Sequence, residues 1–304
     1  MIDSQYIIRN YQPADFNSFV RLRREAEGRH VSPQNVTETL SRPYYSPEQD
    51  LFLIMKAGSI IGYMDILPEP GIGRVVINCW LRPAHRRKGL ATKLLSHAMH
   101  RARDLGVGVA HVNVTEDNAA ARTVLSRLGF KCVRRFLELE LDMSRLSGQE
   151  ANQAAQECRY LSPGEEDKLT DIQNRCFAGT WGYHLNTAAT IAYRTRLSNF
   201  SPEDVVLFCE GDKVIGYCWT EVNYVKDERK GRIFMLGTDP DYRGKGTGKR
   251  LLLSGLAHLK SKGVSIAVLT VDSENVAACA LYRSTGFEVR ANSLWYEKTV
   301  TQAT

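Results

Sequence analysis

The chain has 304 residues, a formal net charge of +6 and seven cysteines. This length suits two domains of ordinary size, and the apolar and charged fractions are those of a globular protein. No apolar run is long enough to span a membrane, the N-terminus lacks the pattern of a secretory signal, and seven scattered cysteines without a Cys-x-x-Cys pair argue against a disulfide framework. We therefore expect a cytoplasmic protein with reduced thiols, whose mild positive charge fits an anionic ligand and a solvated surface equally well.

The hydrophobic pattern predicts strands that alternate with helices in both halves of the chain. In the first half the predicted strands are Tyr6–Arg9, Asp50–Lys56, Ile60–Leu67, Arg74–Trp80, Val107–Val114 and Phe136–Leu141, and the predicted helices are Pro13–Glu27, Gly89–Asp104 and Asn118–Leu128. In the second half the predicted strands are Val205–Glu210, Val214–Glu221, Arg232–Gly237, Ser265–Val271 and Leu294–Val300, with one helix after Gly248 and another after Asn275. Elements in this order predict an α/β (α+β) sandwich around a mixed sheet.

The two halves of the chain repeat one unit. Gly89 and Gly246 are 157 positions apart, and the same offset relates Pro83 to Pro240, Asn118 to Asn275, and Gly129-Phe130 to Gly286-Phe287. A period this long indicates a tandem domain rather than a solenoid. The polar stretch Ser144–Gln156 predicts the boundary. We expect domains at residues 1–145 and 157–304, joined by a linker at 146–156.

The stretch Thr238–Gly248 (TDPDYRGKGTG) lies between a predicted strand and a predicted helix. A glycine-rich turn at a helix start leaves backbone N–H groups unpaired at the positive end of the helix dipole, an arrangement that suits a phosphate or pyrophosphate. Neither the Walker loop nor the dinucleotide fingerprint fits the spacing. The pattern that fits is Arg-x-x-Gly-x-Gly, formed by Arg243, Gly246 and Gly248.

A second motif follows the next strand. Residues 275–287 read Asn-x-x-Ala-x-x-Leu-Tyr-x-x-x-Gly-Phe, with the tyrosine at Tyr282. In this order the two motifs resemble the acyl-CoA pyrophosphate loop and the second signature of the GNAT superfamily of N-acetyltransferases, and the tandem arrangement resembles mycothiol synthase-like proteins. The resemblance implies two tandem GNAT domains, each a six- to seven-stranded mixed sheet flanked by helices and splayed where the co-substrate acetyl-CoA enters.

The resemblance also implies which residues hold acetyl-CoA. In the second unit they are Leu236, Gly237, Thr238, Arg243, Gly244, Lys245, Gly246, Thr247, Gly248 and Asn275, and in the first unit they are Arg86, Arg87, Lys88, Gly89, Leu90 and Ala91. Asn275 also suits a helix N-cap, and capping alone explains it equally well. The basic run that begins at His85 has no aromatic residues for stacking on bases, so we expect CoA phosphate or solvent rather than nucleic acid beside it.

Transfer of an acyl group from a thioester to an amine needs a base for the amine, an N–H donor for the oxyanion and an acid for the thiolate. A tyrosine suits the last role, because its reference pKa of about 10 is close to that of an alkyl thiol. The resemblance assigns this role to Tyr282, and the oxyanion donor to a backbone N–H around Leu236–Thr238. In the first unit Leu125 stands at the position of Tyr282 and cannot donate a proton. We therefore expect a degenerate, non-catalytic first domain.

The general base is left open at this point. Many GNAT proteins carry a glutamate on the strand before the loop, where this chain has Arg232. We select Glu221 as the catalytic carboxylate, with Asp239, Asp241 or a chain of water molecules as alternatives.

The acceptor pocket is expected around Trp181, Tyr183 and His184, in a segment whose alternative role is packing onto the sheet. His184 has no second histidine at metal-ligand spacing and no H-E-x-x-H motif occurs, so no metal is expected.

These observations predict an acetyl-CoA-dependent N-acetyltransferase that moves an acetyl group to a primary amine by direct attack in the C-terminal domain. The acceptor is expected to be a small molecule or a peptide, with neither nucleic acid nor a membrane as partner, and the protein a monomer or homodimer. Two alternatives remain: an acyl-CoA-binding regulatory or interaction protein without turnover, and an enzyme of the mycothiol synthase type.

Overall fold

The computed structural model describes residues 5–28, 31–225 and 228–301 of the chain. The first four residues of the N-terminal stretch considered above lie outside these ranges. By their internal contacts the residues form two compact units, of which unit 1 comprises 1–135 and 293–304 and unit 2 comprises 136–292. Within the described ranges, no helix combines the length and the apolar character needed to cross a membrane.

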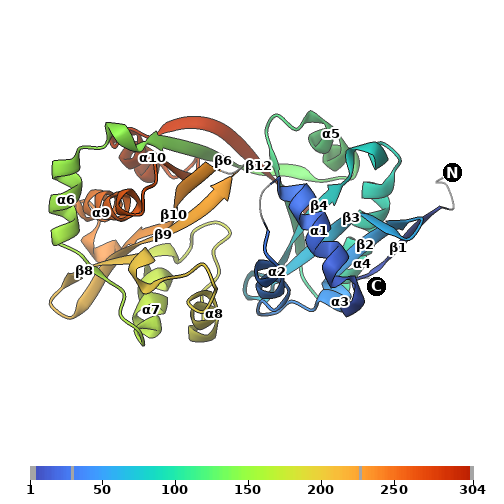
Figure 1. The fold of residues 1–304 in the computed structure, drawn as a ribbon, viewed down its shortest axis with the longest axis horizontal. Helices are drawn as coiled ribbons and strands as arrows, with labels where there is room; N and C mark the ends of the chain where they lie inside the picture. Colours follow the sequence, from blue (N-terminus) through green and yellow to red (C-terminus); the bar gives the residue numbers. More distant parts are fainter. Residues whose placement is uncertain (1–4, 29–30, 226–227, 302–304) are drawn as a thin grey trace. The chain divides into compact units, whose positions relative to one another are not determined.

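Unit 1 is a mixed sheet with helices on both faces (Figure 1). Its elements are β1 Tyr6–Asn10, α1 Phe16–Glu27, α2 Pro33–Leu40, α3 Pro47–Asp50, β2 Leu51–Lys56, β3 Ser59–Glu69, β4 Arg74–Leu81, α4 Leu90–Asp104, β5 Val109–Thr115, α5 Ala119–Arg127, the start of β6 Lys131–Asp142 and the end of β12 Glu288–Thr299. The strand order is β1-β2-β3-β4-β5-β12, in which only β4 and β5 run parallel. Helices α1 and α2 cover one apolar core, and α4 covers a second one.

Unit 2 repeats this plan (Figure 1). Its further elements are α6 Gly148–Gln156, β7 Arg159–Tyr160, α7 Glu166–Phe177, α8 Ala188–Arg194, β8 Val205–Glu210, β9 Lys213–Val225, β10 Glu228–Thr238, α9 Thr247–Ser261, β11 Ile266–Asp272 and α10 Val276–Ser284. The order is β7-β8-β9-β10-β11-β6, again with a single parallel pair, β10 and β11. The expected mixed α/β architecture with two tandem units is confirmed, and each unit has six strands among its described residues.

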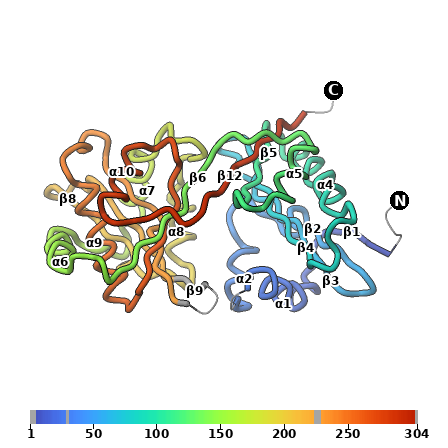
Figure 2. Tube along the Cα trace, turned by 90° about the horizontal axis from the view of Figure 1, so that it is seen from above, coloured from blue at the N-terminus to red at the C-terminus, as the bar shows by residue number. Residues whose placement is uncertain are grey.

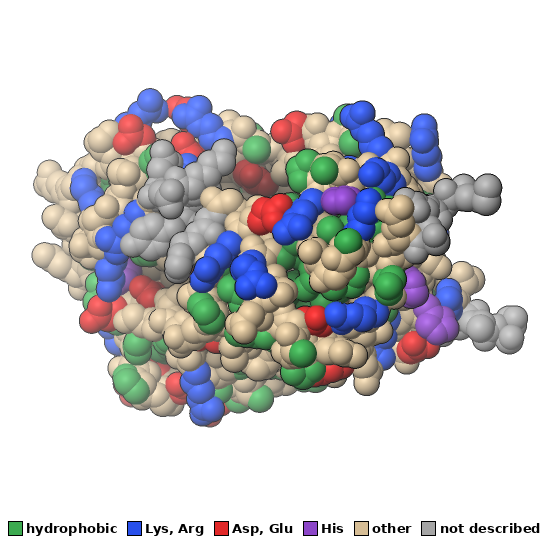
Figure 3. Space-filling model, turned by 45° about the vertical axis from the view of Figure 1, so that its right-hand side comes forward, with side chains coloured by type: hydrophobic (Ala, Val, Ile, Leu, Met, Phe, Trp, Pro, Cys, Tyr) green, Lys and Arg blue, Asp and Glu red, His purple; other side chains and the backbone are tan. Residues whose placement is uncertain are grey.

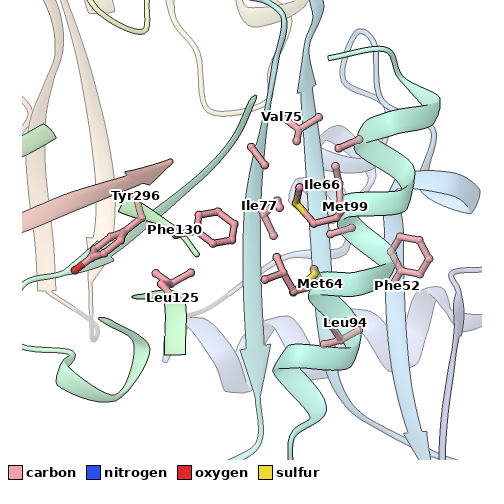
Figure 4. Close-up of a cluster of buried hydrophobic side chains, with 14 of the residues drawn as sticks. Phe52, Met64, Ile66, Val75, Ile77, Leu94, Met99, Leu125, Phe130 and Tyr296 are labelled. Carbon is pink, nitrogen blue, oxygen red and sulfur yellow. The ribbon is translucent and has the colours of Figure 1, made fainter. Parts of the chain in front are cut away.

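The closing strand of each repeat lies in the sheet of the other unit. Residues 136–142 of β6 pair with β11 in unit 2, and residues 293–299 of β12 pair with β5 in unit 1. Figure 2 lets the reader follow both strands along the chain. The apolar side chains agree with this exchange, since Tyr296 packs beside Phe130 and Leu125 in the core of unit 1 (Figure 4). The predicted domain boundaries, 1–145 and 157–304, follow the repeat in the sequence. The compact units instead divide the chain after residues 135 and 292, because each closing strand is counted with the sheet in which it pairs.

One predicted segment needs correction. Residues 148–156, expected within a linker, form helix α6, whose N-cap Ser147 accepts a hydrogen bond from the backbone N–H of Glu150. The helix buries Ala151 and Ala154 in the core that α9 also covers. Two small alanines one turn apart give little hydrophobic signal, so the sequence pattern concealed an amphipathic helix.

We predict that a fragment of residues 1–145 does not fold stably, because it lacks β12. Leu294, Tyr296 and Val300 are buried in the core of unit 1, and burying a large apolar side chain contributes about 1.5–3 kcal/mol. Their loss removes a large part of the 5–15 kcal/mol that typically stabilises a domain. Appending residues 288–301 through a glycine–serine linker should restore a cooperative thermal transition, followed by circular dichroism. A cooperative transition of the unsupplemented fragment would contradict the strand exchange.

Candidate functional site

The loop between β10 and α9 is shaped as an anion cradle. Gly244 and Gly246 have φ angles of +76° and +82°, a left-handed conformation that glycine adopts without steric cost. Gly246 is the N-cap of α9 and has no side chain with which to cap the helix. The N–H groups of Thr247 and Gly248 therefore lack acceptors within the helix and lie at the positive end of its dipole. A phosphate or pyrophosphate is the natural ligand of such a helix start.

The sheet has a gap between β10 and β11, on the side where β10 leads into this loop. Strands β10 and β11 pair only where residues 230–232 lie beside residues 266–268. Further along, β10 pairs with β9 on one side and β11 pairs with β6 on the other, so their facing edges have no strand partner. Leu236, Gly237 and Thr238 lie along this unpaired edge, and a bulge at Phe234 interrupts the register with β9. Backbone N–H groups at such an edge suit a developing oxyanion.

Arg243 braces the loop from within. Its Nε donates to the carbonyl oxygen of Thr238 at 3.3 Å, and its Nη2 donates to that of Cys176 at 2.7 Å. In unit 1 the equivalent Arg86 donates from Nε to the carbonyl of Leu81 at 2.9 Å. The arginine of the loop pattern thus ties the loop to the end of the preceding strand in both units.

Tyr282 is buried on α10, with its ring edge-on to Phe287 at a centroid distance of 5.9 Å. Asn275 caps this helix by accepting a hydrogen bond from the N–H of Ala278, as Asn118 does from Ala121 in unit 1. The predicted cap is confirmed, and it occupies the side-chain oxygen of Asn275. Burial raises the pKa of Tyr282 well above its ordinary value, so its hydroxyl keeps its proton at neutral pH. Among the described residues that hydroxyl has no hydrogen-bond partner.

The structure brings the two sequence motifs together. A Cβ atom on Gly248 would lie 3.5 Å from Cδ2 of Leu281 and 3.6 Å from Oγ1 of Thr238. The start of α9, the end of β10 and the residue next to Tyr282 therefore meet at one place. In unit 1, Leu125 is buried at the position equivalent to Tyr282 (Figure 4).

Glu221 lies on β9 opposite Arg232 of β10, and Oε2 of the glutamate is 4.0 Å from Nη1 of the arginine. It lines a small pocket together with Arg194, Phe200 and Trp219. Since side chains alternate along a strand, Glu221 lies on the same face as Trp219, which packs in the core under α7 and α8. Tyr282 belongs to the core under α9, on the opposite face. The two predicted catalytic residues can therefore act on one group only if it lies in the gap of the sheet.

The aromatic segment after α7 is well anchored. Tyr183 donates from its hydroxyl to Oδ1 of Asn174 at 2.9 Å and stacks at a tilt on Phe177. Trp181 packs on Phe136 at a centroid distance of 6.0 Å, and Nδ1 of His184 lies 3.1 Å from the carbonyl oxygen of Leu185. These contacts order the segment on the face that also carries Glu221.

The loop of unit 1 has the same path with different side chains. Gly89 has a φ of +73°, like Gly246, but Arg87 stands at the left-handed position of Gly244 with a φ of +62°. Lys88 donates from Nζ to the hydroxyl of Tyr6 at 3.3 Å. Strand β4 pairs with β3 without a bulge, in contrast to β10 with β9. On the face seen in Figure 3, Lys and Arg side chains lie in several groups with Asp and Glu between them.

Asp239 does not fit the role of an alternative base. Its side chain is 1% exposed, and both carboxylate oxygens accept hydrogen bonds of 2.8 Å from Arg175. Those bonds hold its pKa below the ordinary range, which makes it a poor proton acceptor. Asp241 is also paired with Arg175, at 3.0 Å.

Sequence reasoning missed Arg175, because no local pattern connects it with a loop 64 positions away. Among the described residues, no cluster of His, Cys, Asp and Glu could hold a metal ion, and the seven cysteines are free thiols.

The chain matches the acetyltransferase (GNAT) family over residues 16–130 and 167–287. It is 28% identical over 240 residues to a protein of Nocardia farcinica named mycothiol acetyltransferase, covering 76% of each chain. It is 31% identical over 241 residues to a protein of the same name from Actinosynnema mirum, covering 76% of this chain and 77% of that protein.

Two solved structures share the fold. A GCN5-related N-acetyltransferase from Sphaerobacter thermophilus superposes with a TM-score of 0.75 at 20% identity, covering 100% of this chain and 98% of that one. A tandem GNAT protein from the clavulanic acid biosynthesis pathway superposes with a TM-score of 0.73 at 13% identity, covering 98% of this chain and 100% of that one.

Proposed function

Since the chain belongs to the GNAT family of acetyltransferases, we propose that unit 2 transfers an acetyl group from acetyl-CoA to a primary amine by direct attack. The observation that carries this proposal is the meeting of the anion cradle before α9, the edge of the gap between β10 and β11, and Leu281 of α10, the residue next to the buried Tyr282.

The residues around the cradle suit acetyl-CoA. The N–H groups of residues 243–248 would receive the pyrophosphate, with Lys245 adding positive charge. The strand edge at Leu236–Thr238 would accommodate the thioester and supply an N–H donor to its oxygen. Gly237 is essential to this edge, because a Cβ atom there would lie 2.7 Å from Cβ of Cys176.

In the proposed acetyl transfer, Tyr282 and Glu221 act from opposite faces of the sheet on a thioester that lies in the gap. The amine nitrogen attacks the thioester carbon, the C–N bond forms and the C–S bond breaks. Tyr282, whose hydroxyl is protonated at neutral pH, gives its proton to the departing CoA thiolate. Burial raises the pKa of Tyr282 and so makes it a weaker acid than an exposed tyrosine. The amine proton passes to Glu221 or through water, and the neighbouring Arg232 offsets the charge of that carboxylate.

Unit 1 has the cradle without the acid. We propose that its loop can hold CoA through residues 86–91, and that Leu125 leaves this unit without turnover. Its role is then structural or regulatory.

The name mycothiol acetyltransferase, which two relatives carry, makes the unacetylated form of mycothiol the first candidate for the acceptor. On the strand before the loop, Arg232 replaces the glutamate that the resemblance to mycothiol synthase-like proteins led us to expect, so this acceptor is one candidate within a panel of amines that includes peptides. An assay of free CoA thiol is run separately with each amine, and the amine that causes CoA release is the acceptor. If no amine causes release, an acyl-CoA-binding protein without turnover is favoured.

We predict that Gly246→Val abolishes acetyl-CoA binding to unit 2. Valine is strained at a φ of +82° and its side chain would project from the cradle. Isothermal titration calorimetry should be performed in a background that also carries Gly89→Val, with Gly89→Val alone as the matched control. Unchanged acetyl-CoA affinity of the double variant would refute the assignment of the loop.

We predict that Tyr282→Phe lowers kcat by about 10²–10⁴-fold, the usual contribution of a general acid, while the KM for acetyl-CoA stays nearly constant. The free energy of unfolding should change by less than about 1 kcal/mol, because the hydroxyl makes no hydrogen bond within the described residues. Steady-state kinetics and denaturant titrations measure the two quantities. Near-wild-type turnover of this variant, together with its loss in Gly89→Val, would place the active site in unit 1.

We predict that Glu221→Gln lowers kcat/KM by less than about 100-fold, since Arg232 lies beside the carboxylate and water can carry the amine proton. The isosteric amide keeps the size of the side chain, and a thermal unfolding measurement serves as the control for folding. A loss greater than 100-fold in a stable variant would make Glu221 the principal base.

A further inference from the structure

Two arginines join the last turn of α7 to the cradle in opposite directions. Arg175 of α7 donates to both carboxylate oxygens of Asp239 at 2.8 Å and to Asp241 at 3.0 Å. Arg243 of the loop donates back to the carbonyl oxygen of Cys176 at 2.7 Å. We call this pair of connections the α7 latch. It links the helix to the loop at residues 239, 241 and 243.

Asp239 is the residue through which the latch reaches the backbone of the loop. Its Oδ1 also accepts a hydrogen bond from the N–H of Asp241 at 3.1 Å, and its own N–H donates to the carbonyl of Ile215 at 2.9 Å. The carboxylate is therefore held by Arg175 and by the N–H of Asp241, and the backbone of the same residue is held by Ile215, at the point where β10 turns into the loop. A buried carboxylate that lost its guanidinium would be destabilised, and the turn that it organises would loosen.

Unit 1 provides an internal comparison. Arg9 pairs with Asp15 before α1 as Arg159 pairs with Glu165 before α7, so the two twelve-residue helices correspond with an offset of 150. Glu25 then corresponds to Arg175. With the offset of 157 that relates the loops, Arg82 corresponds to Asp239.

These corresponding residues also form an ion pair in unit 1, with the charges reversed. Nε of Arg82 lies 3.0 Å from Oε2 of Glu25, and the two side chains are 36% and 44% exposed. In unit 2 the carboxylate side chain is 1% exposed. The connection between helix and loop thus occurs in both repeats, and in the unit that retains the tyrosine its carboxylate is buried and a second contact to Asp241 reinforces it.

We infer that Arg175 is a positioning residue, which acts through Asp239 to hold the cradle in the conformation that receives the pyrophosphate of acetyl-CoA. This inference rests on the proposed function. A loop that is ordered before binding loses less conformational entropy when the ligand arrives. Removal of the latch therefore weakens acetyl-CoA binding and leaves the chemical step, which depends on Tyr282, largely intact.

The test is a double-mutant cycle with Arg175→Gln, Asp239→Asn and the double variant. Each single change should raise the KM for acetyl-CoA by about tenfold, with kcat within about threefold of wild type, because the loss lies in binding. The double variant should again show about a tenfold increase rather than a hundredfold one, since both residues act through one contact. The matched control is Arg159→Gln, which removes a two-bond arginine–carboxylate pair at the other end of α7.

The inference is overturned if Arg175→Gln keeps the wild-type KM for acetyl-CoA, if the two changes add fully, or if Arg159→Gln raises this KM as much. Hydrogen exchange measured without ligand gives an independent readout. The amides of residues 241–243, which donate hydrogen bonds to Asp239 and Pro240, should exchange faster in Arg175→Gln but not in Arg159→Gln. If wild-type protein fails to bind acetyl-CoA, the proposed function fails, and exchange alone decides whether Arg175 positions the loop: equal protection in both variants overturns it.

Discussion

The parallel strand pair at the centre of each unit is the feature on which the rest of the site depends. Strands β10 and β11 share only three residue pairs, and β4 and β5 share the same number. A buried strand edge without a partner is costly unless another group satisfies its N–H and C=O groups. The protein retains this opening twice, and the glycine-rich loop before α9 or α4 lies at its end. The gap is thus the physical basis of the ligand site that we propose in the middle of the sheet.

In the proposed mechanism the gap also allows residues on two faces of one sheet to serve a single reaction. Tyr282 lies in the core under α9, and Glu221 lies on the face covered by α7 and α8. In a closed sheet the backbone would separate them. Where the sheet opens, a thioester in the plane of the strands would be accessible from both faces, so the proposed acid and base need not compete for the same space.

The two units share the features that shape the loop and its helices, and they differ in the residues to which we assign a role in acetyl transfer. Both retain the braced arginine, the glycine N-cap and the asparagine cap. Unit 2 adds the bulge at Phe234 and the buried tyrosine, and in the ion pair between Arg175 and Asp239 it buries the carboxylate. The exchange of β6 and β12 means that each core contains a strand from the other repeat. Unit 1 is therefore part of the folded enzyme irrespective of whether its own loop binds CoA.

The amino-acid sequence by itself determined the tandem repeat, the mixed α/β class and the position of both loops, because glycine spacing and strand periodicity are local properties of the chain. Only the tertiary structure decided which sheet receives each closing strand, since the apolar side chains of 136–141 and 294–300 do not specify the sheet edge that buries them. It also turned Asp239 from a possible base into the partner of Arg175, a pairing between residues 64 positions apart. Helix α6 escaped sequence reasoning because its buried face consists of small alanines. Contacts between distant residues set burial and charge pairing, and no local pattern records them.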